Sequence, residues 1–190
     1  MIRALFVDRD GTINVEKDFI RDPDQLQLIE GSAEAISIAN GLNLKVVVIS
    51  NQSGVARGMM TVEDVQRINS RLEELLAQKG AKVDAMYYCP HHPDYTNHII
   101  CSCRKPDIGL LLRAKADFGV DLRKSFVVGD KLSDVKCGVN AGAFTSLVLT
   151  GYGEDEHRKC VEDGIKIDYL ARNLYDAVTN FVKGKVESGE

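Results

Sequence analysis

Five short apolar runs alternate along the chain with segments of helical spacing. The runs are RALFVD (3–8), LKVVVIS (44–50), AMYYC (85–89), SFVVGD (125–130) and TSLVLT (145–150), and they look like buried strands. Helical spacing occupies residues 32–40, 61–79, 107–118 and 133–141, the second of which opens on a Thr-x-x-Asp capping pattern. This alternation predicts the Rossmann-like α/β class: a parallel sheet with right-handed crossovers and helices on both faces.

The remaining stretches do not divide the chain. Residues 167–182, IDYLARNLYDAVTNFV, predict a short extended piece and a closing helix. The 190 residues fit one domain, and no repeat, low-complexity tract or linker interrupts them. We therefore expect a single domain over residues 1–183, without a large cap domain, followed by a flexible tail at 184–190.

Composition and charge narrow the possible partners. A net charge of -4 carries no basic excess, which argues against nonspecific nucleic-acid binding as the main activity. The N-terminal residues lack a signal-peptide pattern, and no apolar stretch approaches the roughly 18 to 20 residues of a membrane span. We expect a cytoplasmic protein with a small-molecule partner, bound to neither nucleic acid nor membrane.

Polar residues follow the predicted strands where ligands bind to open parallel sheets. Asp8 and Asp10 end the first strand, residues 50–54 (SNQSG) end the second, and Asp130 and Asp134 follow the fourth. Each group alone also fits an ordinary turn or helix cap. Together, Asp8, Asp10 and Asp130 would supply oxygens to a hard cation such as Mg²⁺, which favours carboxylate, water and substrate phosphate.

A second metal pattern lies between residues 89 and 103. Cys89, His91, Cys101 and Cys103 offer three thiolates and an imidazole, a closed set typical of structural zinc sites. His92 and His98 are alternatives to His91, and free cysteines in a flexible loop are the simplest competing interpretation. The other two cysteines, Cys137 and Cys160, are interpreted as a small core residue and a bystander.

These motifs carry a family resemblance. Asp8-x-Asp10-Gly11-Thr12, Ser50, Lys105 and Gly129-Asp130-x-x-x-Asp134 resemble, in order, the four motifs of the haloacid dehalogenase (HAD) superfamily of phosphotransferases. Within this match, DRDGTIN, SNQSGVARG, YYCPHHP, CRKP and GDKLSD resemble the D-glycero-D-manno-heptose 1,7-bisphosphate 7-phosphatase family of lipopolysaccharide-core heptose synthesis. The histidinol-phosphate phosphatases are close relatives that share the zinc loop.

The resemblance implies a catalytic set and a metal set. Asp8 would attack phosphorus, Asp10 would act as general acid and base, and Ser50 and Lys105 would bind the phosphoryl oxygens. Mg²⁺ would be held by Asp8, the Asp10 backbone carbonyl and Asp130, while Asp134 orients Lys105 or the Asp130 turn. The spacing shared with the family favours His91 over its alternatives as a ligand of a structural zinc ion.

It also implies contacts to a phosphorylated sugar. Residues expected to contact the substrate are Glu16, Lys17, Asp18, Phe19, Ser50, Asn51, Gln52, Ser53, Arg104, Lys105 and Lys131. The planar guanidinium of Arg104 is the candidate for holding a second phosphate. We expect a monomer with an open site bordered by loops 16–22 and 89–103.

Three alternatives compete with this function. Histidinol phosphate is the second candidate substrate. A zinc-loop binding module on an inactive scaffold is disfavoured because Asp8, Asp10, Lys105 and Asp130 are all present. A nucleic-acid 3′-phosphatase is disfavoured by the absence of a basic excess.

Overall fold

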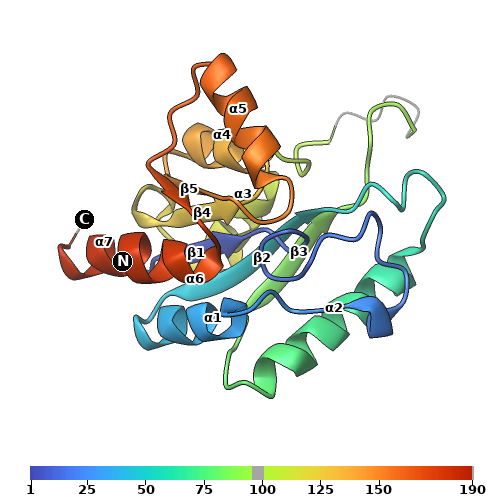
Figure 1. Ribbon diagram of the computed structural model, residues 1–190, viewed down its shortest axis with the longest axis horizontal. Coiled ribbons are helices and arrows are strands. Elements are labelled where there is room, and N and C mark those ends of the chain that lie inside the picture. The colour runs from blue at the N-terminus through green and yellow to red at the C-terminus, as the bar shows by residue number, and fades with distance from the viewer. Residues whose placement is uncertain (96–100, 190) are drawn as a thin grey trace.

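Six parallel strands form one sheet at the centre of the molecule (Figure 1). The computed structural model describes residues 1–95 and 101–189. The sheet order is β3-β2-β1-β4-β5-β6, and the strands are β1 (Ala4–Val7), β2 (Lys45–Asn51), β3 (Ala85–Cys89), β4 (Phe126–Gly129), β5 (Phe144–Val148) and β6 (Tyr169–Ala171). The predicted parallel sheet is confirmed, and β1 lies between β2 and β4, where the strand order reverses.

Helices cover both faces of the sheet (Figure 1). They are α1 (Ser32–Gly41), α2 (Val62–Ala77), α3 (Gly109–Phe118), α4 (Leu132–Ala141), α5 (Gly153–Glu162), α6 (Leu174–Asp176) and α7 (Lys183–Glu187), with a π-helical segment at Ala177–Val182. Short 3-10 turns lie at Pro23–Gln25 and Leu122–Lys124. Helix α2 begins with the predicted capping box, in which the Thr61 hydroxyl accepts from the Asp64 amide at 3.1 Å and the Thr61 amide donates to Asp64 at 2.8 Å.

Alternating side chains of the strands divide the core in two. In β1, Leu5 and Val7 pack in the cluster that contains α1, α2 and the C-terminal helices. Ala4 and Phe6 pack in the opposite cluster, with α3 and α4. This period of two follows from strand geometry, and burial on both faces explains why the central strands are continuously apolar in sequence.

Two elements differ from the sequence expectation. Helix α5 is absent from the predicted set because its sequence, GEDEHRKCVE, buries only Gly153 and Cys160 and shows no apolar stripe. Cys160 lies in a small cluster with Val135 and Leu147. At the C-terminus, α7 is helical to Glu187, so much of the segment expected as a flexible tail from residue 184 is helical. In the described part of the chain, no helix is both long and apolar enough to span a membrane.

Candidate active site

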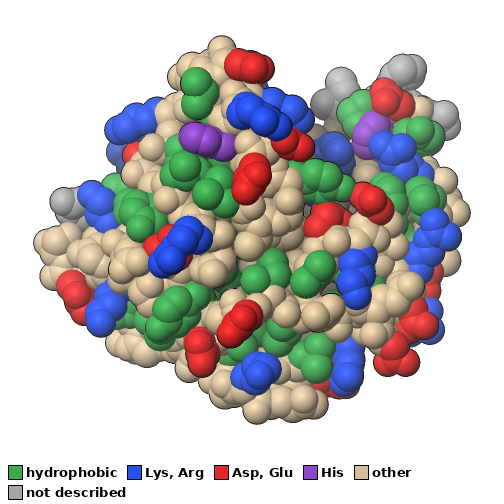
Figure 2. Space-filling model, in the orientation of Figure 1, with side chains coloured by type: hydrophobic (Ala, Val, Ile, Leu, Met, Phe, Trp, Pro, Cys, Tyr) green, Lys and Arg blue, Asp and Glu red, His purple; other side chains and the backbone are tan. Residues whose placement is uncertain are grey.

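Four segments far apart in sequence meet at the carboxyl ends of the central strands. Asp8 follows β1, Ser50 lies near the end of β2, and Asp130 follows β4, the hydrogen-bonded neighbour of β1. Lys105 comes from the loop between β3 and α3. On the face seen in Figure 2, a notch between the part that carries α5 and the part that carries the loop after β3 is bordered by acidic and basic side chains. The sheet topology therefore brings together the residues expected from the sequence.

Lys105 joins two carboxylates in the interior. Its ammonium lies 2.7 Å from Asp8 Oδ1 and 2.5 Å from Asp134 Oδ1, and it donates to the Ile49 carbonyl at 2.8 Å. Burial disfavours the ammonium, but the charges of Asp134 and Asp8 outweigh it and hold the pKa of Lys105 above its ordinary value. Lys105 is therefore a fixed positive charge beside Asp8.

The backbone of Lys105 is fixed by Asn51. The Asn51 side chain donates to the Lys105 carbonyl and accepts from the Lys105 amide, each at 3.0 Å. One side-chain amide thus satisfies both backbone groups of a loop residue, an arrangement that ties the loop after β3 to the end of β2.

Asp130 has an oxygen without a partner. Its Oδ2 accepts from the Tyr152 amide at 2.9 Å, whereas its buried Oδ1 has no hydrogen-bond partner among the described residues. Burial, and next the charge of Asp8, raise the pKa of Asp130 to about 8. Carboxylate oxygens of Asp8, Asp130 and Asp134 lie within 4.8 Å of one another. This donor set fits a hard divalent cation, which would complete the coordination of the orphaned oxygen.

Asp134 is the most heavily paired of these three carboxylates. Besides the Lys105 contact, its Oδ2 accepts from the Lys131 amide at 3.0 Å, at the start of α4. Burial raises the pKa of Asp134 to about 6, against the opposing charge of Lys105. With both oxygens in contact with protein groups, Asp134 is placed to orient Lys105 and the turn after β4.

Asp10 is surrounded by donors. Arg9 donates through Nε to Oδ1 at 3.1 Å and through Nη2 to Oδ2 at 2.7 Å, while the side chains of Asn14 and Gln52 donate at 2.9 and 3.0 Å. Burial opposes ionisation, but the charge and hydrogen bonds of Arg9, with those of Asn14 and Gln52, lower the pKa of Asp10. Sequence reasoning missed Arg9 and Asn14, because their roles depend on side-chain direction rather than on a motif.

Two cavities share Asp10, Asn51 and Lys131. The larger, about 130 Å³, is lined by Asp10, Glu16, Asp18, Phe19, Asn51, Gln52, Ser53, Lys131 and Tyr152. The smaller, about 30 Å³, is lined by Asp8, Asp10, Ser50, Asn51, Lys105, Lys131 and Ser133. Most of the expected catalytic and substrate-binding residues therefore lie around one connected space, together with Tyr152 and Ser133, which the sequence reasoning did not select.

Lys17 and Arg104 lie elsewhere. The Lys17 ammonium donates to the Gln25 carbonyl at 2.8 Å, and Arg104 donates to the His91 carbonyl at 3.1 Å. Neither is among the residues that line the two cavities. Their expected substrate contacts remain predictions.

Tyr152 supports the loop that forms one wall. Its hydroxyl donates to Asp18 Oδ1 at 2.6 Å, and the Lys131 ammonium lies 4.7 Å from its ring centroid. Asp18 and Phe19 have φ angles of 43° and 69°, in the left-handed region that non-glycine residues rarely adopt. Such backbone conformations persist where surrounding contacts hold them, often at ligand-binding segments.

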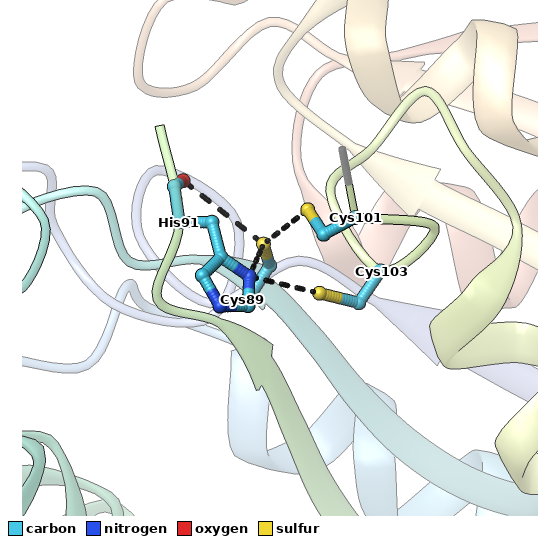
Figure 3. Close-up of side chains that lie close together, drawn as sticks. All are labelled: Cys89, His91, Cys101 and Cys103. Atoms are coloured by element: carbon cyan, nitrogen blue, oxygen red, sulfur yellow. Dashed lines mark hydrogen bonds between the residues drawn. The ribbon is translucent and has the colours of Figure 1, made fainter. Parts of the chain in front are cut away.

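Cys89, His91, Cys101 and Cys103 converge in a separate cluster (Figure 3). Cys89 Sγ lies 3.7 Å from His91 Nδ1 and 3.6 Å from Cys101 Sγ, and Cys103 Sγ lies 3.6 Å from His91 Nδ1. A tetrahedral zinc ion, with Zn–S near 2.3 Å and Zn–N near 2.0 Å, sets its ligand atoms about 3.5 to 3.8 Å apart. These three distances match that spacing, and all four ligand atoms lie within 4.8 Å of one another, so the cluster is compatible with zinc.

The structure distinguishes His91 from its alternatives. His92 lies between Arg57 and Asp94, with its Nε2 3.3 Å from the Arg57 guanidinium and its Nδ1 accepting from the Asp94 amide at 3.3 Å. His98 lies outside the described residues. Among the described histidines, His91 is the one that joins the cysteine cluster.

Comparison with known proteins identifies related phosphatases. A family model described as HAD-hydrolase-like matches residues 102–177. The chain is 40% identical to D-glycero-D-manno-heptose-1,7-bisphosphate 7-phosphatase of Chlorobaculum tepidum, covering 98% of this chain and 97% of that protein. It is 36% identical to D-glycero-beta-D-manno-heptose-1,7-bisphosphate 7-phosphatase of Pasteurella multocida, covering 97% and 98% of the two chains.

A solved structure agrees. The D,D-heptose 1.7-bisphosphate phosphatase of B. bronchiseptica, complexed with magnesium and phosphate, superimposes with a TM-score of 0.85 at 31% identity, over 96% of this chain and 99% of that one. Fold, strand-end carboxylates and these matches define the chain as a phosphatase of the HAD-like class. More narrowly, it belongs to the D-glycero-D-manno-heptose-1,7-bisphosphate 7-phosphatase family, which confirms the resemblance seen in the sequence motifs.

Proposed function

We propose that this protein removes the 7-phosphate of D-glycero-D-manno-heptose 1,7-bisphosphate, in the synthesis of lipopolysaccharide-core or nucleotide-activated heptose. The observation that carries the proposal is that Asp8, Asp10 and Lys105 line one cavity and that Asp130 lies within 4.8 Å of Asp8, in a chain that matches heptose bisphosphate phosphatases over nearly its full length. The thiolate cluster supports a reducing compartment such as the cytoplasm. A monomeric state stays a prediction.

Asp8 would be the nucleophile. Its carboxylate attacks phosphorus in line, the bond to the sugar oxygen breaks, and an aspartyl phosphate forms. Asp10, which lines both cavities, would enter this step in its protonated form, despite the lowering of its pKa by Arg9, and would donate that proton to the departing sugar oxygen. It then takes a proton from the water that hydrolyses the acyl phosphate, so that one side chain serves both half-reactions.

The positive charge around the phosphoryl group would come from two sources. Asp8, the Asp10 backbone carbonyl and Asp130 would hold Mg²⁺, whose chemistry is to neutralise charge on the transferring phosphoryl oxygens. Lys105 would supply a second positive charge, fixed by Asp134. Ser50 would donate its hydroxyl to a phosphoryl oxygen, since Gln52 already donates to the Ser50 oxygen at 2.6 Å and leaves that proton available.

The remainder of the substrate would occupy the cavity of about 130 Å³. It is lined by the polar side chains of Glu16, Asp18, residues 51–53 and Lys131, which suit a hydroxylated sugar. Zinc held by Cys89, His91, Cys101 and Cys103 would have a structural role, because four protein ligands leave no position open for water.

Phosphate release from four substrates tests the proposal. The α and β anomers of heptose 1,7-bisphosphate, heptose 1-phosphate and histidinol phosphate are compared by kcat/KM, with Asp8→Asn as the inactive control. We expect phosphate from the bisphosphates, no phosphate from heptose 1-phosphate, and loss of turnover in Asp8→Asn. A higher kcat/KM on histidinol phosphate would instead support that alternative, and full turnover by Asp8→Asn would contradict the covalent mechanism.

Arg104 is the proposed contact to the second phosphate. Its side chain lies between the cysteine cluster, through the His91 carbonyl, and Lys105, its sequence neighbour. Arg104→Ala is expected to raise KM for the bisphosphate at least tenfold while changing KM for a heptose 7-monophosphate much less. Arg158→Ala, which removes an exposed arginine of α5 that pairs with Asp155, is the matched charge-removal variant. Equal effects of Arg104→Ala on both substrates would rule out this role.

A further inference from the structure

Arg9 is the largest side chain among the fully buried residues, with a relative exposure of 1%. It stands between Asp8 and Asp10 in sequence, yet it lines neither cavity of the active site. A buried guanidinium is costly unless its charge is paired and its donors are satisfied. Its contacts therefore indicate what it does.

The guanidinium is paired edge-on with the Asp10 carboxylate. Nε reaches one oxygen at 3.1 Å and Nη2 reaches the other at 2.7 Å. Two parallel bonds between planar groups fix the plane of the carboxylate as well as its position, which a single bond or a point charge does not do. The Asp10 side chain itself is 17% exposed and faces the cavities, so Arg9 supports it from within the protein.

The third contact of Arg9 is to a different element. Nη1 donates at 3.0 Å to the side-chain oxygen of Asn69, in the middle of α2. Asn69 thereby fixes the end of the guanidinium that Asp10 does not touch. The direction of the Asp10 carboxylate is thus coupled through one rigid cation to a helix that lies outside the catalytic motifs.

We propose that Arg9, held by Asn69, is a positioning residue that aims the Asp10 carboxylate at the leaving-group oxygen. This inference rests on the proposed role of Asp10 as general acid. The orientation of Asp10 affects the rate most when the leaving group is a poor one, such as an alkoxide, because proton donation then lowers the barrier most. It matters little for p-nitrophenolate, which departs as a stable anion without a proton.

The dependence of the activity loss on the leaving group therefore distinguishes orientation of Asp10 by Arg9 from a purely structural role of Arg9. Phenyl phosphate and p-nitrophenyl phosphate have similar size but leaving groups of different basicity. Their kcat/KM values report steps through the first phosphoryl transfer and exclude the later hydrolysis of the aspartyl phosphate, in which Asp10 acts again. The ratio of the two values therefore measures proton donation by Asp10.

The test compares Asn69→Leu, Asn69→Asp and Arg9→Lys with wild type, and uses Ser70→Ala, an exposed neighbour on α2, as control. We expect Asn69→Leu to lower kcat/KM about tenfold for phenyl phosphate and less than threefold for p-nitrophenyl phosphate. Asn69→Asp retains an acceptor for Nη1 and is expected to restore the wild-type ratio. Arg9→Lys keeps the charge without the paired geometry and is expected to give the larger change in ratio, about a hundredfold.

Equal losses on both aryl phosphates, or no loss in Asn69→Leu, would overturn the inference. If Arg9→Lys fails to fold by circular dichroism, the two Asn69 variants decide. Wild-type activity on heptose bisphosphate is measured separately, because its absence would contradict the proposed substrate without changing the ratio between the aryl phosphates.

Discussion

At the scale of single residues, the site concentrates opposite charges in a small buried volume. Lys105 neutralises part of the charge on Asp8 and Asp134, and it is held by both. Among the described residues Asp130 has no equivalent partner on its Oδ1, and burial raises the pKa of its carboxyl to about 8. The protein groups alone do not neutralise the negative charge of this carboxylate. A cation bound there would therefore add more stability than one bound at a carboxylate that is already paired.

Gly11 leaves the room that Asp130 occupies. Its φ of +83° suits glycine, and a Cβ at this position would lie 2.2 Å from Asp130 Oδ2. Gly11→Ala is therefore expected to displace the Asp130 carboxylate and to raise the Mg²⁺ concentration needed for half-maximal activity at least tenfold. The measurement is the Mg²⁺ dependence of kcat/KM. Gly41→Ala is the control, since a Cβ there meets nothing within 4 Å; unchanged Mg²⁺ dependence in Gly11→Ala would refute this account.

The sequence predicted strands and site residues most accurately where a single local pattern identifies them. Buried strands such as β2 are continuous apolar runs, and the carboxylates that follow them lie at strand ends whatever the packing. Helix α5 was missed because its sequence is mostly charged and shows no apolar stripe. Arg9, Asn69 and Tyr152 were missed for a different reason. Arg9 bonds its neighbour Asp10 and also Asn69, 60 positions away, and Tyr152 bonds Asp18, 134 positions away. Only the folded structure shows which of these side-chain atoms meet.

At the scale of elements, the cysteine cluster brings together residues 89–91 and 101–103, directly before Arg104 and Lys105. Removal of zinc, with Mg²⁺ retained, is expected to disorder the loop and raise KM for the bisphosphate, because Arg104 is held through the His91 carbonyl. Hydrogen exchange over residues 89–103 and steady-state kinetics check this. Re-addition of zinc is the control and should restore both. An unchanged KM in zinc-free protein would show that the loop keeps its shape without the metal.

The C-terminal elements depend on Asp176. Its carboxylate accepts from the Arg172 amide at 2.8 Å, Asn180 at 2.7 Å and the Tyr169 hydroxyl at 3.2 Å. Burial opposes ionisation, but these bonds outweigh it and lower the pKa of Asp176. Because the folded-state pKa is the lower one, the stabilisation is complete above the ordinary carboxyl pKa of about 4 and is lost as pH falls through the folded value.

Asp176→Asn is accordingly expected to cost about 1 to 3 kcal/mol in the free energy of unfolding at neutral pH. The difference from wild type should shrink below pH of about 4. Urea unfolding at a series of pH values measures it. Asp163→Asn, a half-exposed ion-pair partner of Lys136, is the control and should cost less than about 1 kcal/mol. A difference that stays constant down to acidic pH would contradict the role assigned to the charge.

At the scale of the whole molecule, the parallel sheet directs the ends of β1 and β4 to one edge, so three buried carboxylates face one buried ammonium there. This cluster of mostly like charges suits catalysis but lowers the free energy of unfolding, a common trade-off between activity and stability. Mg²⁺ bound at the proposed site would bind only the folded arrangement, and at 100 times its dissociation constant it should add about 2.7 kcal/mol to the free energy of unfolding.

In a chain of 190 residues, an increase of about 2.7 kcal/mol in the free energy of unfolding corresponds to a rise in Tm of roughly 5 to 10 °C. The experiment adds MgCl₂ to Mg²⁺-free protein without a chelator, so that zinc stays bound. At a pH above its raised pKa of about 8, Asp130→Asn should raise Tm without Mg²⁺, because it then removes a buried charge, and it should abolish the response to Mg²⁺. Asp155→Asn, on the exposed side of α5, should keep the wild-type response. An equal response in Asp130→Asn and wild type would place the stabilising cation somewhere other than the ends of β1 and β4.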